Sequence, residues 1–322
     1  MNGIHFCLFT HLHYLCTTKE KQKMNNTTKG FACGILAAIT YGTNPLFSLH
    51  LLHLGIDVET ILFYRFALAA AMLGLFITLS GKSLVIPRKA ALPLLLAGVV
   101  FAMSSQTLYQ SFLYMDAGIA CSILFVYPIL VAVIMAVFFH ERASWITYGC
   151  IAVALTGIGL LYQGDGNTSL STTGLLLVIA SSLCYAVYIV GVDHSVLRGV
   201  PSGRMTFWVL SAGALTFFVC TGLGTQLCPL QLSAECLTNV IGVALVPTVI
   251  PILFINVAIK NIGPTYSAII GALEPVTALF IGVGVFGEQL TVRIVIGAAL
   301  IFLAVITIVS KPLIVQYFHK NK

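Results

Sequence analysis

Charged residues are scarce in this chain of 322 residues, because Asp, Glu, Lys and Arg together make up only 8% of it. A soluble globular domain carries about 25%, so the composition excludes an ordinary soluble enzyme. Apolar residues make up 59%, and they form continuous runs of about 18 to 26 residues, long enough to cross a bilayer as helices. The runs lack the alternation of a transmembrane barrel. The sequence therefore predicts an all-α integral membrane protein.

The apolar runs predict ten transmembrane helices, at 30–52, 58–79, 91–115, 117–139, 144–162, 172–192, 204–225, 237–259, 265–287 and 290–310. With a cytoplasmic N-terminus, every Lys and Arg except Arg65 and Arg293 lies in a cytoplasmic segment. The outer loops instead carry acidic residues, namely Asp57, Asp116, Asp165 and Glu235. This asymmetry follows the positive-inside rule. It predicts a multi-pass membrane protein with both termini in the cytoplasm, and it explains the net charge of +6 without a nucleic-acid partner.

Motifs for metal, cofactor or nucleotide chemistry are missing. The nine cysteines show no paired metal-binding spacing, and Cys228 and Cys236, which share an outer loop, are expected to be free thiols. Gly81-Lys82-Ser83 resembles the end of a P-loop, but the earlier glycine and the preceding strand are absent. We therefore expect no cofactor, no metal site and no ATPase.

The chain contains an internal repeat. A shift of 147 positions places Pro128 on Pro275, Glu141 on Glu288, and Ser144 on Thr291. The repeat divides the chain into an N-terminal cytoplasmic extension (1–29) expected to be disordered, a first five-helix half (30–162), a second (172–311) and a cytoplasmic tail (312–322). Because five is odd, the second half must cross the membrane in the opposite sense. The sequence therefore predicts a 5+5 inverted-topology repeat, an architecture of secondary transporters.

Several short motifs resemble those of the drug/metabolite transporter superfamily, in its EamA-like branch with two tandem repeats. They are Phe63-Tyr64-Arg65-Phe66, Tyr127-Pro128 with His140-Glu141-Arg142, Leu273-Glu274-Pro275 with Gly287-Glu288, and the segment 297–303. The resemblance covers about 280 residues, since the two halves account for most of the chain. It implies a ten-helix inner-membrane carrier, often an exporter of amino acids or other small metabolites.

Two charges lie deep in predicted spans. Arg65 in the second span and Glu274 in the ninth each cost at least about 2.5–3.5 kcal/mol in lipid unless paired or hydrated. One interpretation is that Arg65 binds an anionic group of the substrate and Glu274 carries a proton. The alternative is a structural ion pair between them, which their different depths make long or water-bridged.

Polar and aromatic residues in other spans could line a substrate cavity between the halves. The candidates for substrate binding, with Arg65, are Tyr41, Asn44, Gln106, Tyr109, Gln110, Tyr185, Tyr188 and Asn256. Hydrogen bonding between helices is the alternative role for each of them.

Prolines and carboxylates at repeat-related positions predict two further features. Pro128 and Pro275 interrupt their spans and are candidates for helix breaks that serve gating. Glu141 with Ser144, and Glu288 with Thr291, are expected to cap the spans that follow them. Coupling chemistry is the alternative role for the two glutamates.

The sequence as a whole predicts a secondary transporter that moves a small molecule across the bilayer by alternating access without ATP. The alternatives are an intramembrane enzyme, which would need a nucleophile beside a base, and a channel-like or scaffolding membrane protein. A homodimer is compatible with the sequence, which does not specify the oligomeric state.

Overall fold

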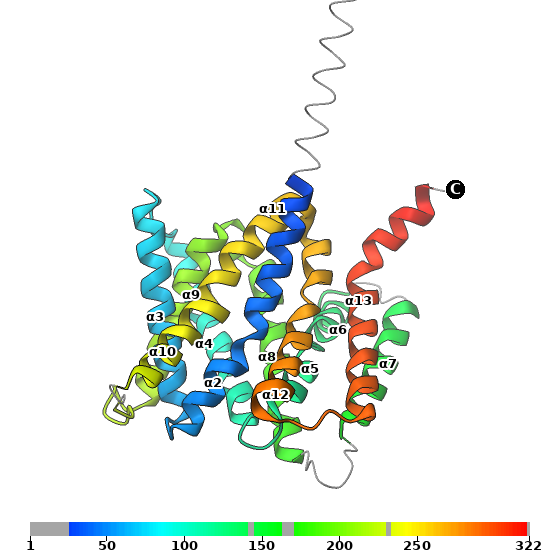
Figure 1. Cartoon of the computed structure of the whole chain (residues 1–322). Coiled ribbons are helices and arrows are strands. Elements are labelled where there is room, and N and C mark those ends of the chain that lie inside the picture. Colours follow the sequence, from blue (N-terminus) through cyan, green and yellow to red (C-terminus); the bar gives the residue numbers. More distant parts are fainter. Residues whose placement is uncertain (1–25, 141–144, 163–170, 230–232, 321–322) are drawn as a thin grey trace, which may run out of the picture.

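The computed structural model describes residues 26–140, 145–162, 171–229 and 233–320, and all regular structure in these ranges is helical (Figure 1). Seven helical segments are long and apolar enough to cross a membrane: Asn26–His53, Val58–Leu79, Arg88–Ser111, Ala117–Phe138, Thr172–Asp193, Ser202–Cys220 and Ala234–Ile255. Shorter apolar helices lie at Tyr148–Leu160, Leu273–Phe286 and Val292–Thr307. The protein is therefore an all-helical, multi-pass membrane protein.

The helices that the structure defines are, in chain order, α2 (Asn44–His53), α3 (Val58–Leu79), α4 (Arg88–Ser111), α5 (Ala117–Leu124), α6 (Tyr127–Phe138), α7 (Trp145–Tyr162), α8 (Thr172–Asp193), the short 3-10 helix η1 (Val196–Gly199), α9 (Ser202–Cys220), α10 (Ala234–Ala244), the π-helical turn η2 (Leu245–Val249), α11 (Ile250–Ile270), α12 (Leu273–Phe286) and α13 (Val292–Lys320). The last of these continues into the segment 312–322 that the sequence assigns to a tail.

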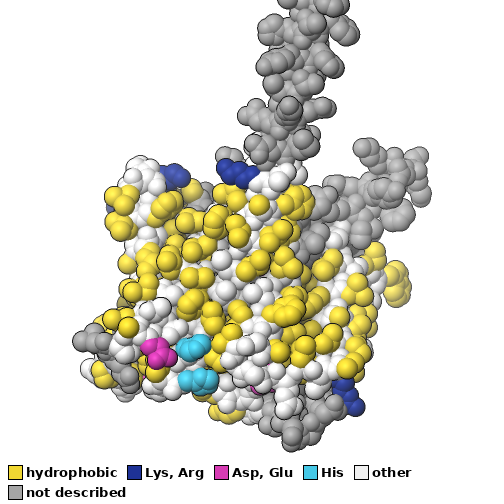
Figure 2. Space-filling view, in the orientation of Figure 1, with side chains coloured by type: hydrophobic (Ala, Val, Ile, Leu, Met, Phe, Trp, Pro, Cys, Tyr) yellow, Lys and Arg dark blue, Asp and Glu magenta, His cyan; other side chains and the backbone are white. Residues whose placement is uncertain are grey.

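The outer surface of the helix bundle is apolar. Large hydrophobic side chains such as Leu75, Leu96 and Phe280 are more than half exposed. Figure 2 shows hydrophobic side chains over most of the visible face, with Lys and Arg mainly at its upper margin. An apolar surface of this extent is typical of a protein that faces lipid.

Small residues allow the helices inside the bundle to approach closely. A side chain at Gly98 of α4 would collide with Ala212 of α9, and one at Gly213 of α9 would lie 2.5 Å from the Phe66 ring of α3. Ser104 and Ser181 are buried where α4 meets α8: Ser104 Oγ donates to the Ser181 carbonyl (3.0 Å), and Ser181 Oγ donates to the Ser104 carbonyl (2.7 Å). Small residues and hydrogen bonds of this kind hold helices together where no hydrophobic effect operates.

Two loops that the sequence places on the cytoplasmic side lie at the same end of the molecule. Arg204 Nη1 donates to the Val85 carbonyl (2.7 Å), and Trp208 Nε1 donates to the Leu84 carbonyl (2.9 Å). These bonds tie the loop after α3, which contains Lys82, to the start of α9.

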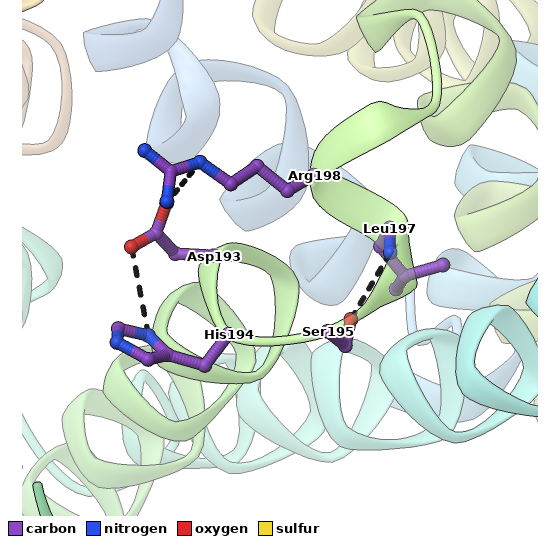
Figure 3. Close-up of polar contacts among 5 residues, drawn as sticks. All are labelled: Asp193, His194, Ser195, Leu197 and Arg198. Carbon is purple, nitrogen blue, oxygen red and sulfur yellow. Dashed lines mark hydrogen bonds and ion pairs between the residues drawn. The ribbon is translucent and has the colours of Figure 1, made fainter.

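The connection from α8 to α9 is organised by a small polar cluster (Figure 3). Asp193 lies between Arg198 and His194, at 3.6 Å and 3.5 Å respectively. Ser195 Oγ accepts a hydrogen bond from the Leu197 amide (3.2 Å) and so begins η1. All three charged or titratable groups are at least partly exposed to solvent, so this cluster contributes little to stability.

Candidate functional site

A cavity of about 370 Å³ lies inside the bundle and is called the central cavity below. Its wall comes from both halves of the chain: Ala37, Ala38, Tyr41, Asn44, Arg65, Phe101, Ser104, Ser105, Leu108, Cys121, Leu124, Phe125, Tyr127, Tyr185, Ile255, Ser267, Gly271, Glu274 and Pro275. The volume is within the range of small-molecule sites, about 300–1,000 Å³. The central cavity thus brings together five residues that the sequence singles out from four different spans, namely Tyr41, Asn44, Arg65, Tyr185 and Glu274.

Arg65 is held in place by neutral partners. Its Nη1 donates to the Tyr109 hydroxyl (2.8 Å) and its Nε donates to Thr248 Oγ1 (3.0 Å). The Tyr109 hydroxyl in turn donates to Asn44 Oδ1 (2.7 Å), so one network joins α2, α3, α4 and η2. Tyr109 is completely buried and supports Arg65 from behind the cavity wall.

The direct ion pair between Arg65 and Glu274 is not formed. The described contacts of the guanidinium go to Tyr109 and Thr248, and Glu274 lines the same cavity from the first turn of α12. The Tyr109 and Thr248 hydroxyl groups therefore occupy the two described hydrogen-bonding directions of the guanidinium, and neither of them connects it to Glu274. A carboxylate near a helix N-terminus is also favoured by the helix dipole.

Helix interruptions meet at the central cavity. The predicted span 117–139 is divided into α5 and α6 at Phe125-Val126, and the chain between α11 and α12 turns at Gly271-Ala272. Pro128 lies in the first turn of α6, and Pro275 lies in the first turn of α12, where a missing N–H costs nothing. These two breaks are at repeat-related positions, and each places a wall residue, Tyr127 or Glu274, at the start of a helix.

Aromatic rings form one side of the central cavity. The rings of Tyr127 and Tyr185 meet edge to face with centroids 4.6 Å apart. Tyr188 stacks on Tyr185 (6.0 Å) and packs against Phe101 (5.1 Å), but it does not line the cavity. Tyr188 therefore packs behind the cavity wall, whereas the sequence analysis expects it to line the cavity.

The structure places Gln106 and Gln110 away from the central cavity. Both side-chain amides donate to Glu59 Oε1, Gln110 over 3.3 Å. Successive residues of a helix differ by 100° in direction, so Ser105 can face the cavity while Gln106 faces α3 and α9. The sequence analysis offers both glutamines as substrate-binding candidates, but neither of them lines the central cavity.

Glu288 caps a different helix from the one that we expected. Its Oε1 accepts a hydrogen bond from the Ala117 amide (2.9 Å) and its Oε2 one from the Gly118 amide (3.1 Å), at the N-terminus of α5 in the other half. Gly287 has φ of 69°, and this left-handed turn directs the chain after α12 back toward α5. Burial, together with the neighbouring Asp116 carboxylate, raises the pKa of Glu288 to about 7.

The remaining predicted caps and ligands are only partly described. Thr291 Oγ1 accepts a hydrogen bond from the Ile294 amide (3.3 Å) at the start of α13. Glu141 and Ser144 lie outside the described residues, and so does the side chain of Asn256.

Sequence reasoning missed several polar groups at the site. Tyr127 and Cys121 line the central cavity, and Thr248 holds Arg65. A signal for Tyr127 exists, since the 147-residue shift pairs it with Glu274. Thr248 follows Pro247 in the π-helical turn, and such turns often occur at functional sites, but the sequence does not reveal that turn.

The chain is similar in sequence to several known proteins. An uncharacterized transporter of Archaeoglobus fulgidus is 27% identical over 195 residues, which cover 59% of this chain and 66% of that protein. The Bacillus subtilis protein named uncharacterized transporter YdfC is 23% identical over 184 residues, which cover 56% of this chain and 59% of that protein. Both alignments span less than two thirds of the relative. The Bacillus subtilis protein named uncharacterized transporter YcbK is 25% identical over 304 residues, which cover 89% of this chain and 95% of that protein.

Among the solved structures that are similar, a crystal structure aligns with a TM-score of 0.63 and 18% identity, covering 87% of this chain and 96% of the other. At that identity the similarity shows the fold alone. The sequence profile of the EamA-like transporter family matches residues 28–163 and again residues 172–310. The two tandem matches confirm the family and the duplication that the short motifs indicate, and they favour a transporter over an enzyme. The chain is a membrane transporter of the drug/metabolite type and belongs to the EamA-like transporter family.

Proposed function

We propose that the protein is a secondary transporter that carries a small metabolite through the central cavity by alternating access, without ATP. The observation that carries this proposal is the composition of the cavity wall, where one guanidinium, one carboxylate and several tyrosines face the same space inside an apolar bundle. A buried charge that merely stabilised the fold would be neutralised by a partner charge. Arg65 instead has neutral partners, which leaves its charge available to a ligand.

Each polar group has a role in this proposal. The planar guanidinium of Arg65 binds an anionic group of the substrate with two hydrogen bonds, Tyr41 and Tyr185 contact the rest of the molecule, and Glu274 carries the coupled proton. Asn44 orients the network through Tyr109. The repeat-related breaks before Pro128 and Pro275 are the points at which two inverted five-helix halves, ten helices in all, exchange conformations.

The test is solute counterflow into proteoliposomes that contain the purified protein and no nucleotide, with a panel of amino acids, nucleosides and quaternary amines. Glu274→Gln should flatten any pH dependence of uptake, because the amide cannot exchange a proton, and Arg65→Lys should weaken binding, because an ammonium cannot form the planar pair of bonds. Glu235→Gln, which removes an exposed carboxylate of α10, is the control. An unchanged pH response of Glu274→Gln would remove the proton role and leave facilitated diffusion.

We also propose that the N-terminus and the C-terminus are cytoplasmic, in the plasma membrane. The hydrogen bonds of Arg204 and Trp208 support a common face for the loops at Lys82 and Arg198. In a variant whose native cysteines are replaced by serine, impermeant thiol reagents applied to intact cells should label Glu235→Cys, and they should label Lys82→Cys and Arg198→Cys only after permeabilisation. Labelling of Lys82→Cys and Arg198→Cys from opposite sides would contradict the proposed topology.

A further inference from the structure

Two contacts between a histidine ring and a phenylalanine ring join the two halves of the chain. The His50 ring near the end of α2 meets the Phe286 ring at the end of α12 edge to face, with centroids 5.1 Å apart. The His194 ring after α8 meets the Phe139 ring after α6, with centroids 4.2 Å apart. They are called the outer contact (His50 and Phe286) and the inner contact (His194 and Phe139) below, after the faces on which the proposed topology places them.

The internal repeat relates the two contacts to each other. The shift of 147 positions places Phe139 on Phe286. A shift of 144 positions, which aligns the first span with α8, places His50 on His194. The residue that follows each phenylalanine has a left-handed backbone conformation, with φ of 56° in the first half and 69° in the second. The same pair of rings, carried by the same kind of helix end, therefore occurs twice.

Each histidine ring is held by an acceptor at its own helix end. His50 Nδ1 donates to the Leu46 carbonyl one turn earlier in α2. His194 Nδ1 lies 3.5 Å from the Asp193 carboxylate, which also pairs with Arg198 (Figure 3). Because a carbonyl or carboxylate oxygen only accepts, Nδ1 carries the hydrogen in both rings. Each histidine is thus oriented by its own half of the chain, and the phenylalanine comes from the other half.

Both contacts lie at the far ends of helices that line the central cavity. Glu274 lines the cavity at the start of α12, and Phe286 follows it by twelve residues. Tyr127 lines the cavity at the start of α6, and Phe139 again follows by twelve residues. At 1.5 Å per residue each phenylalanine is about 18 Å along its helix from the cavity, comparable to half of a hydrocarbon core of roughly 30 Å.

The helix pairs that the two contacts join also correspond to each other. α12 packs against α2, and α6 packs against α8. One helix of each pair belongs to the first half of the chain and the other to the second. In the proposed inverted arrangement the two pairs end on opposite faces of the membrane, so separating the ends of one pair opens a route from the cavity to one face only.

We propose that the outer and inner His–Phe contacts are the two gates of the central cavity. The outer contact closes the route between α2 and α12, the inner contact closes the route between α6 and α8, and one of them opens at a time. This inference rests on the proposed alternating access and names the residues that regulate it. Two rings suit a gate because they exclude water and can separate without breaking the hydrogen bonds of either helix. Both contacts are formed in this structure, which has both gates closed.

Cys121 provides a native reporter for these gates, because it lines the central cavity. The full-length protein, with Cys121 as its single cysteine, is treated with a charged, membrane-impermeant methanethiosulfonate. Intact cells expose the outer face, which is the face from which Glu235→Cys is labelled, and inverted membrane vesicles expose the inner face. The rate at which Cys121 is modified from each face is measured without any substrate.

Two phenylalanine variants should change these rates in opposite ways. Phe286→Ala should accelerate modification of Cys121 from the outer face alone, and Phe139→Ala from the inner face alone. We expect an increase of about threefold to tenfold, the factor that corresponds to the loss of one aromatic pair. Phe280→Ala in α12 and Phe138→Ala in α6 are the matched controls, because each ring is 72% exposed on the apolar surface, and neither should change either rate.

The histidines give a second measurement of the same gates. The double change His50→Ala with His53→Ala removes both rings that contact Phe286, since the His53 ring lies 5.9 Å from it, and it should reproduce the increase from the outer face. His194→Ala should reproduce the increase from the inner face. These variants decide the matter if a phenylalanine variant does not fold.

Equal rates in Phe286→Ala and Phe280→Ala would overturn the proposal, and so would an increase from the same face in Phe286→Ala and Phe139→Ala. A folded variant that accelerates modification from both faces would also overturn it, because the two contacts would then not act separately. Failure of counterflow in the wild-type protein would contradict the proposed transport without changing these rates, so the two hypotheses can fail independently.

Discussion

At the scale of single residues, the site depends on one hydroxyl group. The Tyr109 hydroxyl accepts from Arg65 and donates to Asn44, and it does so from a completely buried position. A buried donor or acceptor that loses its partner costs about 1–3 kcal/mol. Tyr109 therefore determines the orientation of two residues in the wall of the central cavity without lining it.

Tyr109→Phe tests this dependence. The variant leaves Arg65 Nη1 and Asn44 Oδ1 without their shared partner, so we expect the free energy of unfolding to fall by about 1–3 kcal/mol and substrate affinity to fall with it. Tyr188→Phe is the matched control, because the Tyr188 ring stacks on Phe101 and Tyr185 and its hydroxyl has no hydrogen bond in the described structure. Thermal unfolding in detergent and counterflow measure the two effects. Equal behaviour of both variants would show that the hydroxyl network is dispensable.

The chemistry of the site was easier to predict than its geometry. Arg65 and Glu274 stand out in the sequence because charges are costly in apolar spans, and the structure places both in one cavity. The neighbours of Gln106 were not predictable, since the sequence gives the direction of a side chain around its own helix but not which helix lies there. For the same reason the sequence did not predict the contact between Thr248 and Arg65, which are 183 positions apart in the chain.

At the scale of helices, the sequence predicted where the apolar segments lie and not where they bend. The predicted span 58–79 coincides with α3, whose N-cap Asp57 is a local signal. The span predicted at 117–139 is two helices, because Pro128 cannot continue the hydrogen bonding of the preceding turn. Whether a proline kinks, breaks or merely begins a helix depends on which neighbours satisfy the freed carbonyl groups, and those neighbours are distant in sequence.

The contact between the first span and α12 leaves no room for a side chain. A Cβ atom at Gly42 would lie 2.5 Å from the Glu274 carbonyl oxygen and 2.5 Å from Thr277 Cβ. Both atoms belong to the first turns of α12, so a displacement there moves the carboxylate of the central cavity. Gly42 is thus the residue through which the first span positions Glu274.

Gly42→Ala should lower stability and transport together. Overpacking costs about 1–3 kcal/mol, and the better helix propensity of alanine returns at most about 1 kcal/mol. Gly191→Ala in α8 is the control, because a Cβ there meets nothing within 4 Å and only the gain in propensity applies. Thermal unfolding of both variants, with initial rates of uptake, measures the difference. A Gly42→Ala protein as stable and active as Gly191→Ala would contradict the close contact.

At the scale of the whole molecule, the two halves are joined at the central cavity and also at the end of the bundle. Glu288, which follows α12 in the second half, bonds to the amides that begin α5 in the first half. A side chain at Gly282 would collide with the Glu288 carboxylate, so this carboxylate packs directly against the last turns of α12. In the proposed alternating-access mechanism, this contact would have to break or form again in each transport cycle.

The Glu288 contact predicts a pH dependence of stability. The pKa of Glu288 is raised from 4.5 to about 7, mainly by burial and further by Asp116. A carboxyl group with a raised pKa in the folded state stabilises that state fully below about pH 4.5, and the contribution is lost as the pH rises through 7. Glu288→Gln keeps an acceptor for the Ala117 and Gly118 amides but cannot ionise.

We therefore expect the melting temperature of wild type to fall relative to that of Glu288→Gln between pH 5 and pH 8. The control variant Glu235→Gln should show the same pH dependence as wild type. A constant difference between wild type and Glu288→Gln across this range would show that the carboxyl group does not titrate there, and the connection between the halves would then be independent of pH.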